Sequence, residues 1–192
     1  MLLRVKCGIT GAGEGKRPDH GIPFTITFQD AVTDLIEHLG ARRDFGGLQF
    51  TAVLMEHAVG ELHPDVLRSR EFRTAVDAFV DAVSLHNDIA SYEEVEEGTI
   101  GNNGVEVARR ALGVSRREAT ALIDGLLTAR VDTLAHAPAA VPPGAAGFTR
   151  PLQEALAGSY LWHEVTGRFG PCGAAVVGKP RGLGMSAAYA FR

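Results

Sequence analysis

The chain has 192 residues, of which 45% are hydrophobic and 22% charged, and its formal net charge is −4. This length favours one domain with a sizeable core. The negative balance argues against a nucleic-acid partner, because Lys and Arg carry most of the affinity for phosphate backbones. No apolar run approaches the ~20 residues of a membrane span, and the N-terminus has no convincing signal-peptide cleavage site. Two distant cysteines, Cys7 and Cys172, make no disulfide framework, so we expect a cytoplasmic protein.

The first 28 residues are rich in Gly and charge, and we expect them to be a poorly ordered segment. Within them, FTITF at 24–28 alternates like a short strand. The run GAGEGK at 11–16 does not match a phosphate-binding loop, because that loop needs Gly, four residues and then Gly-Lys-Ser/Thr. A dinucleotide-binding turn is disfavoured as well, because Pro18 follows too closely for a helix.

Helical periodicity begins at Gln29. Apolar residues recur at Val32, Leu35, Ile36 and Leu39, the spacing of a buried helix stripe. Gly46-Gly47 breaks this helix, and a second one follows over 48–60. A third, long helix is predicted from Asp65 or Ser69 to about Glu97.

Further helices are predicted over 102–112 and 117–137, separated by the turn at 113–115. Ser115 and Glu118 have the spacing of a capping box. A linker rich in Ala and Pro occupies 137–147, and a last helix covers 149–167. The sequence therefore predicts an all-α fold, with an N-terminal segment over 1–28, a helical domain over 29–169 and an irregular Gly-rich tail over 170–192.

The segment NDIASYEE, within the long predicted helix, carries the most specific chemical signal. At 100° per residue, Asn87, Ser91 and Glu94 fall within a stripe of about 60° on one helix face. An amide, a hydroxyl and a carboxylate are hard oxygen donors, which suit Mg²⁺. The alternative is a polar helix face with an incidental Asn.

These residues, in the context NDIASYEEVEEG, resemble the second metal motif of class I bacterial terpene synthases, Asn-Asp-x-x-Ser-x-x-x-Glu. The resemblance continues upstream in RRDFGGLQFTAVLMEHAVGELHPDV and downstream in SYLWHEVTGRF, and the tail GLGMSAA is similar to endings of the germacradienol/geosmin synthase group. The chain looks like the C-terminal half of such a synthase, with the match covering about 35–188 and the N-terminal half of the α-helical bundle missing.

The resemblance implies a role for each matching position. Asn87, Ser91 and Glu94 would hold one Mg²⁺ of a cluster that binds the diphosphate of an isoprenoid substrate such as farnesyl diphosphate. Arg43 or Arg42 would sense the diphosphate, and Arg168 would donate hydrogen bonds to it.

The remaining implied roles concern the substrate cation. Gly47 would mark the helix break whose carbonyl faces the cation. Rings of Phe45, Phe50, Phe79 and Trp162 are candidates for an apolar cavity wall, although ordinary core packing is the more common role of such side chains.

The sequence departs from the family pattern in three ways. Position 95, where the metal-binding Glu would stand, is Val, so Glu94 takes its place one residue early. Phe169 replaces the Tyr of the Arg-Tyr pair and lacks its hydroxyl. No aspartate-rich first metal motif occurs in the sequence, and apolar helix faces left uncovered would promote self-association.

Three hypotheses follow from the sequence. One is a Mg²⁺-dependent sesquiterpene cyclase, truncated and without turnover in isolation. Another is a catalytically inactive helical remnant that interacts with a full-length homologue. The last is an unrelated helical binding protein. A zinc site at His57, His63 and His86 and an anion site at Arg109-Arg110 with Arg116-Arg117 are disfavoured, because ordinary surface or core roles explain them better.

Overall fold

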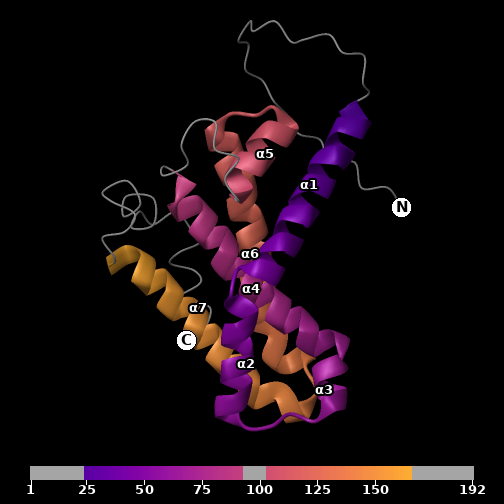
Figure 1. Cartoon of the computed structure of the whole chain (residues 1–192), viewed down its shortest axis with the longest axis vertical. Coiled ribbons are helices and arrows are strands. Elements are labelled where there is room, and N and C mark those ends of the chain that lie inside the picture. The colour runs from indigo at the N-terminus through magenta and orange to yellow at the C-terminus, as the bar shows by residue number, and fades with distance from the viewer. Residues whose placement is uncertain (1–23, 93–102, 166–192) are drawn as a thin grey trace, which may run out of the picture.

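In a computed structural model, residues 24–92 and 103–165 are described, and every regular element within them is a helix, which confirms the all-α prediction. The elements are α1 Phe24–Phe45, α2 Leu48–Val59, α3 Pro64–Arg68, α4 Arg70–Ala90, α5 Gly104–Leu112, α6 Arg116–Ala140, the 3-10 turn η2 Pro143–Ala145 and α7 Ala146–Val165. In Figure 1, α4 lies at the centre beside α6, and α1 runs from α5 at the top towards α2 below. None of the described helices is both long and apolar enough to cross a membrane.

Helix α4 supplies much of the core, because α6, α7, α1 and α5 all pack against it. Its ring at Phe72 lies 5.1 Å, centroid to centroid, from that of Phe148 on α7. The largest fully buried apolar side chains are Phe79, Phe148, Leu85, Ile123, Leu127, Leu134, Leu152 and Leu156. Burial of these side chains is the main term that holds the helices together.

Local chemistry sets the ends of several helices, as the sequence predicted. Gly47, at φ +75°, separates α1 from α2, and the left-handed region that it occupies favours glycine. The capping box at the start of α6 is confirmed, because the Ser115 side chain accepts from the Glu118 N–H and the Glu118 side chain accepts from the Ser115 N–H.

One long-range contact compensates for a proline inside α6. Pro138 has no N–H, so the carbonyl of Leu134 lacks its usual helical donor. The side chain of Gln153 on α7 donates to that carbonyl at 3.0 Å. This contact explains how α6 continues to Ala140, into the segment predicted to be a linker.

The structure corrects four further expectations. Residues 24–28 begin α1 and form no strand. Of the two predicted starts of the long helix, Ser69 is confirmed, because its hydroxyl caps α4, while Pro64–Arg68 form the separate helix α3. Helix α4 ends at Ala90 rather than near Glu97. The last helix starts at Ala146, and α6 and η2 take up most of the predicted linker.

The buried stripe of α1 also differs from the prediction. Val32 is 38% exposed and Ile36 64% exposed, whereas Ala31 and His38 are buried. The face that packs inward is therefore partly polar, which apolar periodicity does not detect.

Candidate functional site

The described part of the metal motif lies at the C-terminal end of α4. Ser91 is the residue that follows the last helical turn; its N–H donates to the Asn87 carbonyl at 2.8 Å, and its hydroxyl donates to the same carbonyl at 2.7 Å. A hydroxyl that donates its proton keeps lone pairs for another partner. The helix C-terminus carries partial negative charge, which favours cations.

The Asn87 amide is held between two other helices. Arg42 on α1 donates from Nη2 to Oδ1 at 3.2 Å. The amide nitrogen Nδ2 lies 3.3 Å from Nε2 of His163 on α7. Asn87 thus joins residues that are 45 and 76 positions away in the sequence.

The next residue, Asp88, is buried and joins α1, α4 and the start of α5. Its Oδ2 accepts from the Gly104 N–H and lies within hydrogen-bond distance of His38 Nε2, both at 2.8 Å, and its Oδ1 lies 3.3 Å from Arg42 Nη2. We call these groups the Asp88 cluster. A carboxylate at the first turn of α5 is favoured by the helix dipole.

Gly104 belongs in this cluster because there is no room for a side chain. A Cβ at that position would lie 3.1 Å from Asp88 Oδ2 and 3.2 Å from His38 Nε2. A side chain at this position would therefore require Asp88 or His38 to shift by a few tenths of an ångström.

Two turns earlier on α4, Asp81 forms a second buried ionic cluster. Arg43 donates to both of its carboxylate oxygens, at 2.8 and 2.7 Å, and Arg130 Nε lies 3.1 Å from Oδ2. Arg43 also lies 3.5 Å from the half-buried Asp77. We call these four residues the Asp81 cluster. The hydrogen bonds to Asp81 raise the pKa of the Arg43 guanidinium further, and burial raises the pKa of Asp77.

These contacts distinguish the two arginines that the sequence left as alternatives. Arg43 is fixed by a bidentate pair, the strongest geometry available to a guanidinium. Arg42 lies beside the metal motif, and its buried Nε has no hydrogen-bond partner among the described residues. Arg42 therefore keeps donor capacity next to Asn87, whereas Arg43 is committed to Asp81.

A group of rings borders Asn87 on the side of α7. His86 stacks on Tyr160 with centroids 3.8 Å apart and meets His163 edge-on at 4.5 Å. Burial, with a smaller contribution from His163, lowers the pKa of His86 to about 3, so this ring is neutral at physiological pH. The zinc alternative gains no support, because no three His, Cys, Asp or Glu side chains in the described ranges gather as a metal site would require.

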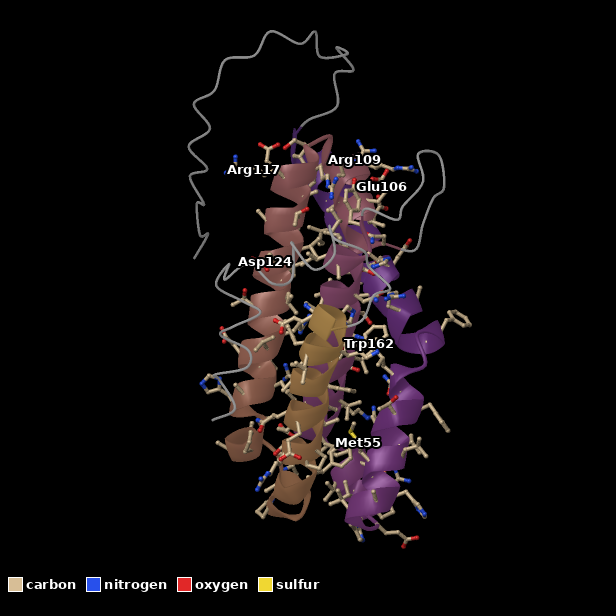
Figure 2. All side chains as sticks on the ribbon, turned by 90° about the vertical axis from the view of Figure 1, so that its left-hand side faces the viewer. Met55, Glu106, Arg109, Arg117, Asp124 and Trp162 are labelled. Atoms are coloured by element: carbon tan, nitrogen blue, oxygen red, sulfur yellow. The ribbon has the colours of Figure 1, made fainter. Side chains whose placement is uncertain are left out.

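The four aromatic candidates for a cavity wall separate into two kinds. Phe79 is fully buried in the core, as ordinary packing explains. Phe45, Phe50 and Trp162 are 87%, 66% and 45% exposed, so none of the three is core packing. In Figure 2, Trp162 lies on the side of α7 nearest α1 and α2, and its ring meets His163 edge-on.

Three of the four arginines in the pairs on α5 and α6 have local partners. Figure 2 shows Arg109 beside Glu106. Arg109 and Arg110 both bind Glu106, which also accepts from the Tyr92 hydroxyl at 2.9 Å. These contacts hold the pKa of Glu106 down at about 2. Arg116 lies over the Tyr92 ring at 4.7 Å. A structural role therefore explains these cations.

The donor set of the motif fits a hard divalent cation in its described part. Asn87 and Ser91 offer neutral oxygen atoms one helical turn apart, and Asn87 Oδ1 has a second lone pair beside the one used by Arg42. Glu94 and Arg168 lie outside the described residues.

Sequence reasoning missed Asp88, Asp81 and His163. One signal was available: Asp81 and Asp88 are seven residues apart, so they share a face of α4 with buried Ala78 and Leu85. An acidic residue on a buried face requires a partner, and α1 offers two arginines. No comparable signal marks His163.

Comparison with known proteins agrees with this helical architecture and its metal motif. A family model described as terpene synthase family 2, C-terminal metal binding, matches residues 27–133, more than half of the chain. The chain therefore belongs to the terpene synthase family.

Two curated relatives are fungal proteins. Sesquiterpene synthase 3 of Postia placenta (strain ATCC 44394 / Madison 698-R) is 30% identical over 112 residues, which cover 58% of this chain and 31% of the relative. Sesquiterpene synthase Agr3 of Cyclocybe aegerita is 25% identical over 149 residues, which cover 73% of this chain and 42% of the relative. The chain thus spans less than half the length of either relative. The bacterial germacradienol/geosmin group stays a prediction.

Proposed function

We propose that this chain carries part of the diphosphate site of a Mg²⁺-dependent terpene cyclase that acts on a linear isoprenoid diphosphate, with farnesyl diphosphate as the substrate. The observation that carries the proposal is the position of Arg42 beside Asn87 at the end of α4, within a chain that belongs to the terpene synthase family. The two relatives are both named sesquiterpene synthases, which supports a C15 substrate.

The chemistry assigns different tasks to the residues. Asn87, Ser91 and Glu94 would hold the cation, and a bound Mg²⁺ supplies the positive charge that a departing diphosphate requires. Arg42 would donate to the diphosphate through its under-used guanidinium, with Arg168 as a second donor. The break at Gly47 would leave backbone groups free to face the substrate.

Arg43 is a positioning residue in this proposal. Its bidentate pair with Asp81 fixes the last turn of α1 against α4 and so fixes the neighbouring Arg42. We infer that Arg42, of the two, is the diphosphate-sensing residue.

The test is to incubate the purified chain with Mg²⁺ and farnesyl diphosphate, and to measure both binding and volatile products. We expect Mg²⁺-dependent binding that Asn87→Ala weakens at least tenfold, since one ligand of the cation is lost. We expect no turnover from these 192 residues alone, because their sequence lacks an aspartate-rich motif. Binding that is independent of both Mg²⁺ and Asn87 would exclude the proposed site.

A second candidate function is an inactive helical partner of a full-length homologue. The exposed apolar side chains favour it: Phe45 and Phe50 stand out from α1 and α2, and Leu161 and Trp162 from α7. In this case the chain would bind a homologue or itself, and Mg²⁺ with farnesyl diphosphate would give no binding signal. A cytosolic location stays the prediction for either function.

A further inference from the structure

We propose that His163 is a positioning residue, which fixes the Asn87 side-chain amide so that Oδ1 rather than Nδ2 faces Arg42 and the proposed cation. The contact between the two residues joins α4 to α7 across 76 positions of the sequence. The inference deepens the proposed function and rests on it for its functional meaning.

The first step is the protonation of the His163 ring. Its Nδ1 lies 2.7 Å from the backbone carbonyl of Ser159. A carbonyl oxygen can only accept a hydrogen bond, so Nδ1 must carry a proton. Arg42 has only donors and takes the Asn87 amide oxygen, so Nδ2 is the amide atom that faces His163, and Nε2 is the acceptor in that contact.

The second step is the orientation of the amide. Asn87 presents a donor, Nδ2, and an acceptor, Oδ1, at nearly the same distance from its Cβ. An acceptor at His163 Nε2 selects Nδ2 as its partner at 3.3 Å. The guanidinium of Arg42 has only donors, and it lies 3.2 Å from Oδ1. The two neighbours therefore select the same orientation from opposite sides.

The third step is the consequence for a cation. In the selected orientation the amide oxygen lies on the side of Arg42 and has a lone pair left for a metal ion. In the flipped orientation, two amide N–H groups would face the Arg42 donors and the cation, and Nε2 would face the amide oxygen with no proton between them. His163 is 3% exposed, so water does not readily replace the lost partner.

The chain offers a matched control for this local geometry. His136 on α6 makes the same contact as His163 with the carbonyl four residues earlier, Nδ1 to Asp132 O at 2.7 Å, but its side chain is exposed. Replacing His136 removes a comparable local hydrogen bond without any effect on Asn87.

The experiment is NMR on the ¹³C,¹⁵N-labelled full chain at neutral pH, with the His163 ring assigned through its through-bond correlations to the His163 backbone. We expect a proton on Nδ1 and none on Nε2. A proton on Nε2 would overturn the inference. Because this readout uses the unmutated protein, it remains decisive if a variant fails to fold.

The second readout is the Asn87 side-chain amide signal, assigned with Asn87→Asp. His163→Leu removes the acceptor and is expected to shift this signal. His163→Gln, whose amide oxygen can accept from Nδ2, is expected to restore it, and His136→Leu to leave it unchanged. Equal signals in the Leu and Gln variants would contradict an acceptor role.

The third readout is binding of Mg²⁺ with inorganic pyrophosphate, measured by calorimetry. We expect His163→Leu to weaken binding about tenfold and His163→Gln to stay within about twofold of the unmutated chain. Equal affinity in these two variants would overturn the inference. If Asn87→Ala leaves pyrophosphate binding unchanged, the proposed function fails, while the ring spectrum still decides whether His163 orients the amide.

Discussion

Two aspartates on the same face of α4, Asp81 and Asp88, are each 1% exposed and each pair with an arginine of α1. Asp81 is bound by Arg43 through two short hydrogen bonds and by Arg130. Asp88 is bound mainly by His38 and by the Gly104 N–H, and Arg42 contacts it only at 3.3 Å. In the Asp81 cluster the donors of Arg43 are taken up by the carboxylate, whereas in the Asp88 cluster Arg42 keeps donors that Asp88 does not use.

The two arginines therefore differ in role, although their aspartate partners lie only two turns apart on α4. A guanidinium held in a bidentate pair has little to offer a substrate. Arg42 makes both of its longer contacts through one nitrogen, Nη2, so its other terminal nitrogen keeps donors for a further anion. The Asp81 cluster therefore fixes α1 on α4, and the Asp88 cluster holds Arg42 and Asn87 where a diphosphate could meet them.

The largest expected effect comes from breaking the Asp81 cluster. Asp81→Ala removes the shared acceptor of Arg43 and Arg130, and we expect the free energy of unfolding to fall by about 3–5 kcal/mol. Urea denaturation measures this fall in the free energy of unfolding. The matched control is Asp77→Ala, which removes the half-buried partner of the same Arg43 and should cost about 0–1 kcal/mol. Equal losses in the two variants would contradict a dominant role for Asp81.

A smaller effect is expected when the Asp88 cluster is crowded. Gly104→Ala places a Cβ against Asp88 Oδ2 and His38 Nε2, and we expect a loss of about 1–3 kcal/mol in the free energy of unfolding. The control is Gly125→Ala on α6, where a Cβ would meet nothing within 4 Å, and this change should stabilise the helix by up to about 1 kcal/mol. A stabilising Gly104→Ala would show that α5 does not need this close approach.

The pH dependence of stability tests a third ionic group, formed by Glu106 with Arg109 and Arg110. The folded pKa of Glu106 is about 2, below its ordinary value of 4.5, so its stabilising contribution is present above pH 4.5 and is lost as the pH falls towards 2. Glu106→Gln should therefore flatten the fall in unfolding free energy within this window. The exposed Glu154, paired with Arg150, provides the control Glu154→Gln, and an identical slope in both variants would argue against the prediction.

The smallest effect on stability is expected for the exposed phenylalanines of α1 and α2. Phe45→Ser and Phe50→Ser should change the free energy of unfolding by no more than about 0.5 kcal/mol, because both rings are largely exposed. Phe79→Ala, in the core, should cost about 3–5 kcal/mol. Sedimentation measurements should show less self-association in the two Ser variants if the exposed rings mediate it.

Much of the fold could be predicted from local sequence chemistry. Helical periodicity identified the main helices. The pair Gly46-Gly47 marked a break, which the structure shows with Gly47 at positive φ, and Ser115 with Glu118 marked a helix start. The end of α4 could not be predicted in the same way. Ser91 is compatible with a helix, but its hydroxyl bonds to the Asn87 carbonyl as the helix ends, a competition that the sequence pattern does not settle.

The candidate site was only partly predictable for a related reason. The motif identified Asn87 and Ser91, because their spacing is local. The partners of Asn87 and Asp88 lie on other helices, 50 positions away at His38 and 76 away at His163. A buried polar residue indicates that a partner exists, but only the packing of helices determines which residue it is.

The most direct test of the central claim compares the affinities of Arg42→Gln and Arg43→Gln for Mg²⁺ with inorganic pyrophosphate. We expect Arg42→Gln to weaken binding about tenfold to a hundredfold. It should lower stability less than Arg43→Gln does, because Asp88 keeps its contacts with His38 and the Gly104 N–H. Arg43→Gln should lower stability and weaken binding much less than Arg42→Gln does, because Arg43 acts only by positioning Arg42. If Arg43→Gln weakens binding as much as Arg42→Gln in a folded protein, or if neither does, the division between a structural and a diphosphate-binding arginine is contradicted.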